Sequence, residues 1–217
     1  MSELRAKNRS RLLPLVAIFC GSLVIAEVLA SKIIHFGPFI VPAGVLAYSV
    51  TFLMTDTIEE VWGKEVAKHV VLAGFLSLVI VFFLILVAVY LPHPAFWTNQ
   101  EAYKSILGMG KGALRITIAS IVAYLISQYH DVWCFNFWRK LTKGKHLWLR
   151  NNASTIQSQL IDSIIFILIA FTGIMPILPL IIGQWVAKII IAVVDTPFIY
   201  GLVKWVGPRV VKDDYSR

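Results

Sequence analysis

The chain has 217 residues, of which 58% are hydrophobic and only 15% are charged, and its formal net charge at pH 7 is +8. Soluble domains carry about 25% charged residues. The composition therefore excludes an ordinary soluble domain and indicates an integral membrane protein. Cys20 and Cys134 lie in or beside apolar segments, and two isolated cysteines indicate neither a disulfide framework nor a metal site.

Six apolar segments are long enough to cross the hydrocarbon layer of a bilayer, which takes roughly 20 helical residues. In chain order they are Leu12–Ser31, Ile40–Glu60, Val70–Leu91, Ala113–Phe137, Asn152–Ile174 and Leu178–Val206. Pro176 and Pro179 separate the last two, because proline cannot continue a helix. The sequence therefore predicts an all-α integral membrane protein, a bundle of six transmembrane helices that forms one domain over residues 1–217. Residues 1–11 and 207–217 are predicted to be the terminal segments outside the bilayer.

The Lys and Arg residues near the ends of these spans are divided unequally, with 15 on one side and three on the other. The larger group comes from the N-terminus, the second-to-third loop, the fourth-to-fifth loop and the C-terminal tail. Because such residues are enriched in cytoplasmic loops, both termini are predicted to be cytoplasmic, which agrees with an even number of spans. The basic loops could instead be patches for lipid or nucleic acid. Topology accounts for them, so no nucleic-acid partner is expected.

Polar side chains follow one helical face of five predicted spans. Span by span, the main members are Cys20, Glu27 and Ser31; Ser49, Asp56 and Glu60; Thr117, Ser120, Tyr124, Gln128 and Asp131; Asn151, Asn152, Thr155, Ser158, Gln159 and Asp162; and Gln184, Lys188 and Asp195. The span Val70–Leu91 has no charge and is predicted to face lipid. Single Ser and Thr residues commonly form hydrogen bonds between packed helices. Hydrogen bonds of this kind do not account for the carboxylates, because an unpaired ion within a bilayer is costly. They indicate a hydrated cavity, a protonated acid or a substrate rich in hydrogen-bond donors.

The charged side chains leave alternatives open. Lys188 and Asp195 are seven residues apart on one face, so they could form a structural ion pair or bind substrate separately. We expect Asp162 to accept hydrogen bonds from the donor edge of a substrate; the alternative is a structural partnership, for example with Lys188. Arg115 falls outside the stripe of its span and could lie at an irregular helix start or extend outward to the interface. We find no metal-ligand spacing, phosphate loop or catalytic constellation, so neither an enzyme nor a cofactor is expected.

Three segments are specific enough to indicate a family. They are TDTIEEVWGKEVA, RITIASIVAYLISQYHDVWCFNFWRK and GKHLWLRNNASTIQSQLIDSIIF, at Thr55–Ala67, Arg115–Lys140 and Gly144–Phe166. Together they resemble the queuosine precursor transporter family, also called the vitamin uptake transporter family. The resemblance implies a six-helix importer in the bacterial inner membrane for 7-deazaguanine bases, such as 7-cyano- and 7-aminomethyl-7-deazaguanine, which are used in tRNA modification. Glu27 stands where an uncharged amide is expected.

A guanine-like base presents two donors beside one acceptor, which suits carboxylate or amide oxygens together with a cationic or amide donor. The substrate-binding residues expected from the stripes and the resemblance are Glu27, Asp56, Arg115, Tyr124, Gln128, Asp131, Asn152, Gln159, Asp162, Lys188 and Asp195. The expected partners are this small molecule and the lipid bilayer, and a homodimer is left open. The alternative function is a substrate-capture subunit that depends on an ATP-driven partner complex. A membrane enzyme acting on lipid is a third reading, which the missing catalytic motif disfavours.

Overall fold

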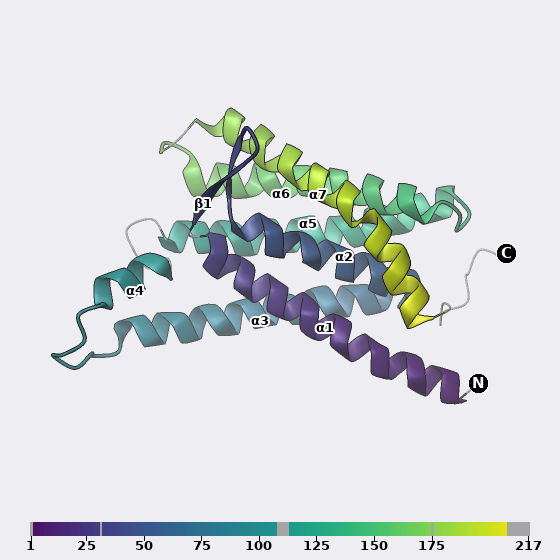
Figure 1. Ribbon diagram of the computed structural model, residues 1–217, viewed down its shortest axis with the longest axis horizontal. Coiled ribbons are helices and arrows are strands. Elements are labelled where there is room, and N and C mark those ends of the chain that lie inside the picture. The colour runs from purple at the N-terminus through teal and green to yellow at the C-terminus, as the bar shows by residue number, and fades with distance from the viewer. Residues whose placement is uncertain (1, 31, 108–112, 175, 208–217) are drawn as a thin grey trace.

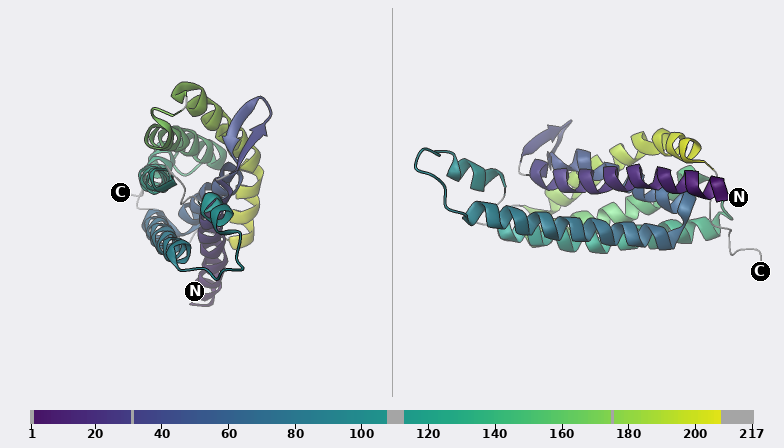
Figure 2. Two further views of the ribbon diagram at one scale, coloured as in Figure 1. Left: turned by 90° about the vertical axis from the view of Figure 1, so that its left-hand side faces the viewer. Right: turned by 90° about the horizontal axis from the view of Figure 1, so that it is seen from below.

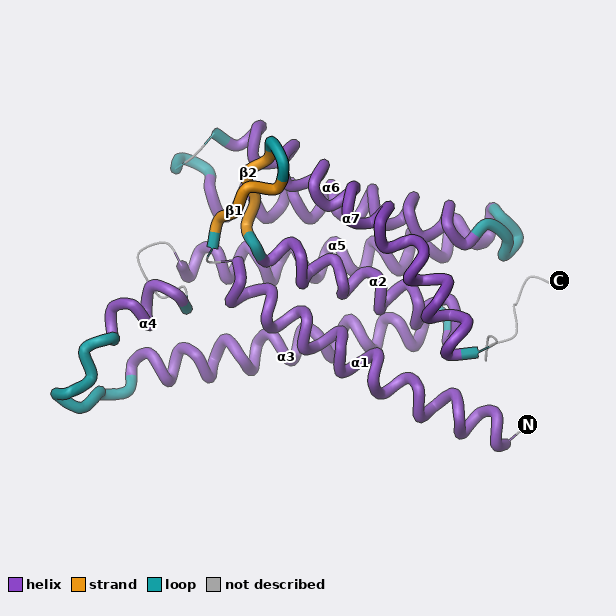
Figure 3. Tube along the Cα trace, in the orientation of Figure 1, coloured by secondary structure: helices purple, strands orange, loops and turns teal. Residues whose placement is uncertain are grey.

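The computed structural model describes residues 2–30, 32–107, 113–174 and 176–207 (Figure 1). Its elements are α1 (Ser2–Ala30), β1 (Ile33–Phe36), β2 (Phe39–Pro42), α2 (Gly44–Trp62), α3 (Lys64–Tyr90), α4 (Gln100–Ile106), α5 (Ala113–Leu141), α6 (Leu147–Phe171) and α7 (Ile177–Val206). The long helices run alternately in opposite directions and lie side by side in an elongated bundle (Figures 1 and 2). The hairpin β1–β2 and α4 lie at one end of the bundle, opposite the start of α1 and the end of α7 (Figure 3).

Among the described residues, four helices are long and apolar enough to span a membrane. They are α1 from Ser10 onward, α3, α6 and α7. The other two long helices, α2 and α5, are more polar, and α2 carries Asp56, Glu59 and Glu60 within 19 residues. Helix α2 packs against α1, α3, α5 and α7, so its polar groups lie inside the bundle. The chain is a helical membrane protein with four such spans, and the count of six stays a prediction.

The all-α prediction is wrong at the start of the second predicted span. Strands β1 and β2 pair antiparallel with Phe36 opposite Phe39, around a turn in which Gly37 has φ +59°. The β-branched residues of these strands favour extended backbone, and glycine adopts the left-handed turn without steric cost. The segment Ile40–Pro42 therefore belongs to the hairpin, and α2 begins only at Gly44.

Most other helix ends extend past the predicted spans. Helix α1 begins at Ser2, α3 at Lys64 and α6 at Leu147, because hydropathy marks the apolar stretch of a helix and polar turns continue beyond it. The sequence did not predict the short helix α4. Ser31, the predicted end of the first span, lies outside the described residues, as does the tail 208–217.

One side of α3 packs into the bundle, while the other carries the apolar residues expected to face lipid. Leu76, Phe83 and Leu84 are at least half exposed. On the packed side, a Cβ atom added to Gly74 would lie 2.4 Å from the Tyr124 hydroxyl oxygen. The absence of a side chain at this position lets α5 approach α3 closely.

Helices α1 and α2 also meet at a glycine. A Cβ atom on Gly44 would lie 2.4 Å from the carbonyl oxygen of Ala26 and 3.1 Å from the Cβ of Ala30. Small residues at such a crossing allow backbones to approach within van der Waals contact. This contact positions the start of α2, and with it the first cavity described below.

The two-sided distribution of basic residues predicts an orientation that labelling can test. The α5–α6 loop and the start of α3 lie at the same end as Ser2 and Val206 (Figure 1), and this is the Lys- and Arg-rich side. In a background of Cys20→Ala and Cys134→Ser, Asn99→Cys should react with a membrane-impermeant maleimide in intact cells. Lys143→Cys should react only after permeabilisation. Reaction of both cysteines in intact cells would contradict the six-span topology.

Candidate functional site

Two cavities with polar groups in their walls meet at Lys188 on α7, which lines both of them. The first lies between α1, α2, α5, α6 and α7. The volume in which the centre of a water molecule fits is about 60 Å³. Its polar and aromatic lining residues are Glu27, Tyr48, Ser120, Asp162, Phe166, Gln184 and Lys188. The second is much smaller, about 10 Å³. Its polar lining residues are Ser49, Asp56, Asn151, Thr155, Gln159, Lys188 and Asp195.

An ion pair between Lys188 and Asp162 separates the two cavities. Lys188 Nζ donates to Asp162 Oδ2, and both side chains are buried. Asp162 Oδ1 accepts hydrogen bonds from the Tyr48 hydroxyl at 2.9 Å and from the Ser127 hydroxyl at 3.1 Å. The ammonium also lies 5.0 Å from the centroid of the Tyr48 ring, within cation–π range. The carboxylate is thus fully paired by groups from three other helices.

This geometry decides between the alternatives for Lys188. The structure pairs it with Asp162 on α6 and not with Asp195 on its own helix. Seven residues along a helix are about 10.5 Å apart, so an i,i+7 pair needs two long side chains, and aspartate is short. The neighbouring helix α6 brings a carboxylate closer. Of the two pairings that the sequence left open for Lys188, the structure therefore has the one with Asp162 and not the one with Asp195.

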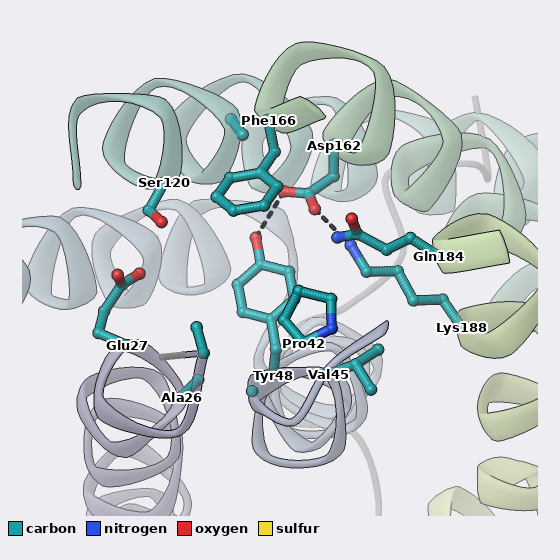
Figure 4. Close-up of a pocket in the computed structure, with 13 residues that line it drawn as sticks. Ala26, Glu27, Pro42, Val45, Tyr48, Ser120, Asp162, Phe166, Gln184 and Lys188 are labelled. Carbon is teal, nitrogen blue, oxygen red and sulfur yellow. Dashed lines mark hydrogen bonds and ion pairs between the residues drawn. The ribbon is translucent and has the colours of Figure 1, made fainter. Parts of the chain in front are cut away.

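The first cavity has polar groups on two opposite walls (Figure 4). Glu27 and Ser120 lie on one side, while Asp162, Gln184 and Lys188 lie on the other, with the Phe166 and Tyr48 rings between them. Gln184 is buried, and its Oε1 atom has no hydrogen-bond partner within the described part of the chain. The cavity therefore combines aromatic faces with an acceptor that is left for a ligand.

Six of the eleven residues expected to bind substrate line one of these cavities. Those in the first are Glu27, Asp162 and Lys188, and those in the second are Asp56, Gln159, Asp195 and again Lys188. The structure brings them together from α1, α2, α6 and α7. The other five line neither cavity.

Two of these five support helix ends or helix contacts. Arg115 Nε donates to the carbonyl oxygen of Ile169, and its Nη2 donates to that of Thr172 at 2.9 Å. Arg115 therefore caps the C-terminal end of α6, where carbonyl groups lack helical partners and a positive charge is favourable. The Tyr124 hydroxyl donates to the carbonyl oxygen of Val71 at 2.7 Å, which joins α5 to α3.

The remaining three also lie between helices. Gln128 Nε2 donates to the Thr51 hydroxyl at 3.2 Å, which connects α5 with α2. Asn152 Nδ2 donates to the Thr196 hydroxyl at 2.8 Å, which connects α6 with α7. Asp131 is completely buried and lies next to Asp56 behind the second cavity. The polar face of one helix can thus carry both residues that line a cavity and residues that form hydrogen bonds to neighbouring helices.

Sequence reasoning did not include three aromatic or amide side chains of the first cavity among the expected ligands. Phe166 follows Asp162 by four residues, and Gln184 precedes Lys188 by four. Because residues four apart are neighbours on a helix surface, the sequence did place both on the same helical face as these charged residues, but it did not mark them as ligands. Tyr48 had no such signal, since the stripe of its helix was drawn through the adjacent Ser49.

A separate buried ion cluster connects α2 with α5 and α6. Glu60 Oε2 lies 3.1 Å from Arg139 Nη1 and 3.2 Å from Arg150 Nη1. Both arginines are almost completely buried, and the Arg150 guanidinium lies 5.5 Å from the centroid of the Phe135 ring. Glu60, which the sequence placed on the polar stripe of its span, therefore has a structural role.

Comparisons with known proteins agree on one family. A family model described as "Putative vitamin uptake transporter" matches residues 42–202. The "Probable queuosine precursor transporter" of Bacillus subtilis is 32% identical over 168 residues, which cover 75% of this chain and 72% of that protein. The "Queuosine precursor transporter" of Escherichia coli is 26% identical over 59% of this chain and 54% of that protein. A "Probable queuosine precursor transporter" of Haemophilus influenzae is 29% identical over 59% and 51%, respectively. No solved structure matches the chain significantly.

Proposed function

Because the chain belongs to the vitamin uptake transporter family, we propose that it imports queuosine precursors, bases of the 7-deazaguanine class, across the bacterial inner membrane. In this proposal one domain of six spans, with both termini in the cytoplasm, contains the whole transport path. The family is one of transporters, and we assign the chain no catalytic role. The first cavity is the proposed binding site for the base.

The observation that carries this assignment is the unpartnered Gln184 Oε1 atom in the wall of that cavity. A guanine-like edge presents an N–H group and an amino group as donors, which need acceptors once they leave water. Gln184 supplies one acceptor, and the Glu27 carboxylate supplies another from the opposite wall. Phe166 and Tyr48 provide aromatic faces on which the ring system can stack.

The proposed role of Asp162 differs from the sequence-based expectation that it accepts directly from the base. Its oxygens already accept from Lys188, Tyr48 and Ser127. We propose that Asp162 holds Lys188 and Tyr48 in position, and that the Lys188 ammonium is the donor nearest to a carbonyl oxygen on the base. A charge-assisted hydrogen bond of this kind is stronger than a neutral one.

Gln184→Leu should weaken binding of a 7-deazaguanine base while the protein stays folded. The leucine keeps the approximate volume but leaves a donor of the base unpaired, which costs about 1–3 kcal/mol, or roughly 5- to 150-fold in affinity. We would measure binding by titrating 7-cyano- and 7-aminomethyl-7-deazaguanine, guanine, biotin and riboflavin into purified protein in nanodiscs. The matched control is Gln157→Leu on the exposed side of α6, outside both cavities. Equal affinities of the two variants for the base would show that Gln184 does not contact it. Failure of the protein to bind any of the bases would contradict the proposed function.

Uptake into proteoliposomes tests the alternative of a capture subunit. The protein alone should accumulate the base that it binds, because the proposed path needs no second polypeptide. Binding without any uptake, followed by uptake when an ATP-driven partner is added, would favour the capture subunit instead.

A further inference from the structure

The second cavity has an oxygen-rich lining that the proposed base site does not use. It contains about 10 Å³ of space, which is the size of one water molecule or one small ion. Asp56 Oδ1, Asn151 Oδ1 and Gln159 Oε1 belong to side chains on its wall, and each of these side chains is at most 3% exposed. None of the three oxygens has a hydrogen-bond partner in the part of the chain that the structure describes.

A single water molecule cannot satisfy this lining. Water donates two hydrogen bonds, so at least one of three acceptor oxygens would stay unpaired in a buried site, which is costly. A cation, in contrast, accepts electron density from all of them at once. Hard cations prefer this set of ligands, namely carboxylate and amide carbonyl oxygens.

The charge balance also favours a cation. Within the described ranges, Asp56 has no Lys or Arg at ion-pairing distance. Its carboxyl group lies at hydrogen-bonding distance from that of Asp131, and even with one proton shared between them this pair of acids keeps one negative charge. The Lys188 ammonium beside the cavity is already paired with Asp162. A buried carboxylate inside a membrane protein needs a proton or a counter-ion.

We propose that the second cavity binds a monovalent cation of the size of sodium, held by Asp56, Asn151 and Gln159. The Ser49 hydroxyl and the Asp195 carboxylate on the same wall complete the oxygen set. Neutral amide and hydroxyl oxygens make up most of this set, and the Lys188 ammonium on the same wall offsets one of its carboxylates, which suits a monovalent ion because divalent ions in proteins gather more negative charge. Coupling ions of secondary transporters bind in comparable positions, next to the substrate and within the membrane.

The ion and the base are linked through Lys188, and this second step rests on the proposed function. Lys188 forms a wall of both cavities. A cation in the second cavity repels the ammonium and holds it on Asp162, on the side where the base binds. Without the cation, the ammonium can turn toward Asp56 and Asp195, and the base site loses its donor. Sodium should therefore increase the affinity for the base, and the base should increase the affinity for sodium by the same factor.

The ion site can be tested without the base. The melting temperature of purified protein in nanodiscs is measured in sodium chloride, potassium chloride and choline chloride at equal ionic strength. At a sodium concentration tenfold above its Kd, the melting temperature should rise by roughly 3–6 °C over that in choline. Asp56→Asn and Asn151→Ala should lose this rise, while Asn99→Ala, an exposed change before α4, should keep it. Two variants are used so that one remains informative if the other does not fold.

Equal melting temperatures in the three salts would overturn the ion site. A melting temperature that changes with pH but not with sodium would also overturn it, since Asp56 would then carry a proton. The coupling is tested separately by measuring base affinity in sodium and in choline, with an expected gain of roughly fivefold or more in sodium. If sodium raises the melting temperature but does not change base affinity, the ion site is supported and only the coupling is overturned. If sodium raises the melting temperature and the protein binds no base, the ion site is supported and the proposed function is contradicted.

Discussion

Replacing Lys188 with methionine should lower the free energy of unfolding by about 3–5 kcal/mol, the usual cost of leaving one member of a buried ion pair without its partner. Methionine keeps most of the length of the side chain, being one atom shorter, but removes the ammonium that pairs with Asp162. The carboxylate would keep only the hydroxyl donors of Tyr48 and Ser127. Unfolding of the purified protein in mixed micelles measures the loss.

Adding Asp162→Asn to Lys188→Met should recover most of this stability, because the second change removes the unpaired charge. The double variant should nevertheless bind the base weakly, since the proposed donor is missing. Lys104→Met is the control, as the Lys104–Glu101 pair is at the surface and should contribute at most about 1 kcal/mol. A double variant no more stable than Lys188→Met would show that the ion pair does not explain the loss.

Glu60→Gln should lower the free energy of unfolding nearly as much as Lys188→Met, although Glu60 lies outside both cavities. Glu60 Oε2 is shared by Arg139 and Arg150, which are 4% and 1% exposed. Without this carboxylate both buried guanidinium groups lose the charged oxygen that they share, so we expect a loss of about 3–5 kcal/mol. Base affinity of the protein that remains folded should be unchanged, because the cluster contacts neither cavity.

The adjacent Glu59 provides a matched control for this prediction. It is also buried, but neither of its carboxylate oxygens has a hydrogen-bond partner among the described residues. Lys64 and Arg139 attract the Glu59 carboxylate without a hydrogen bond to it, while its burial is costly, so Glu59→Gln should lower stability much less than Glu60→Gln. Equal losses for the two variants would show that burial at this level of the helix, and not the pairing with arginine, determines stability.

The sequence by itself determined the class of the protein, its mainly helical character and its family. Long apolar segments need a bilayer around them, and the polar stripes identified Asp162 and Lys188 as residues that must face the protein interior. These conclusions depend on composition and on the angle of each residue about its own helix, both of which are local. Confirmation of the family by the comparisons shows that the three motifs were specific.

Only the tertiary structure decided which groups meet. Helical periodicity gives the direction of a side chain, but it does not say which neighbouring helix lies there or at what height. For that reason Lys188 pairs with Asp162 across α6 and α7 instead of with Asp195 along α7. Arg115 reaches the last carbonyl groups of α6 for the same reason. The β1–β2 hairpin and the division of the polar interior into two cavities likewise depend on contacts between segments distant in sequence, which no local pattern contains.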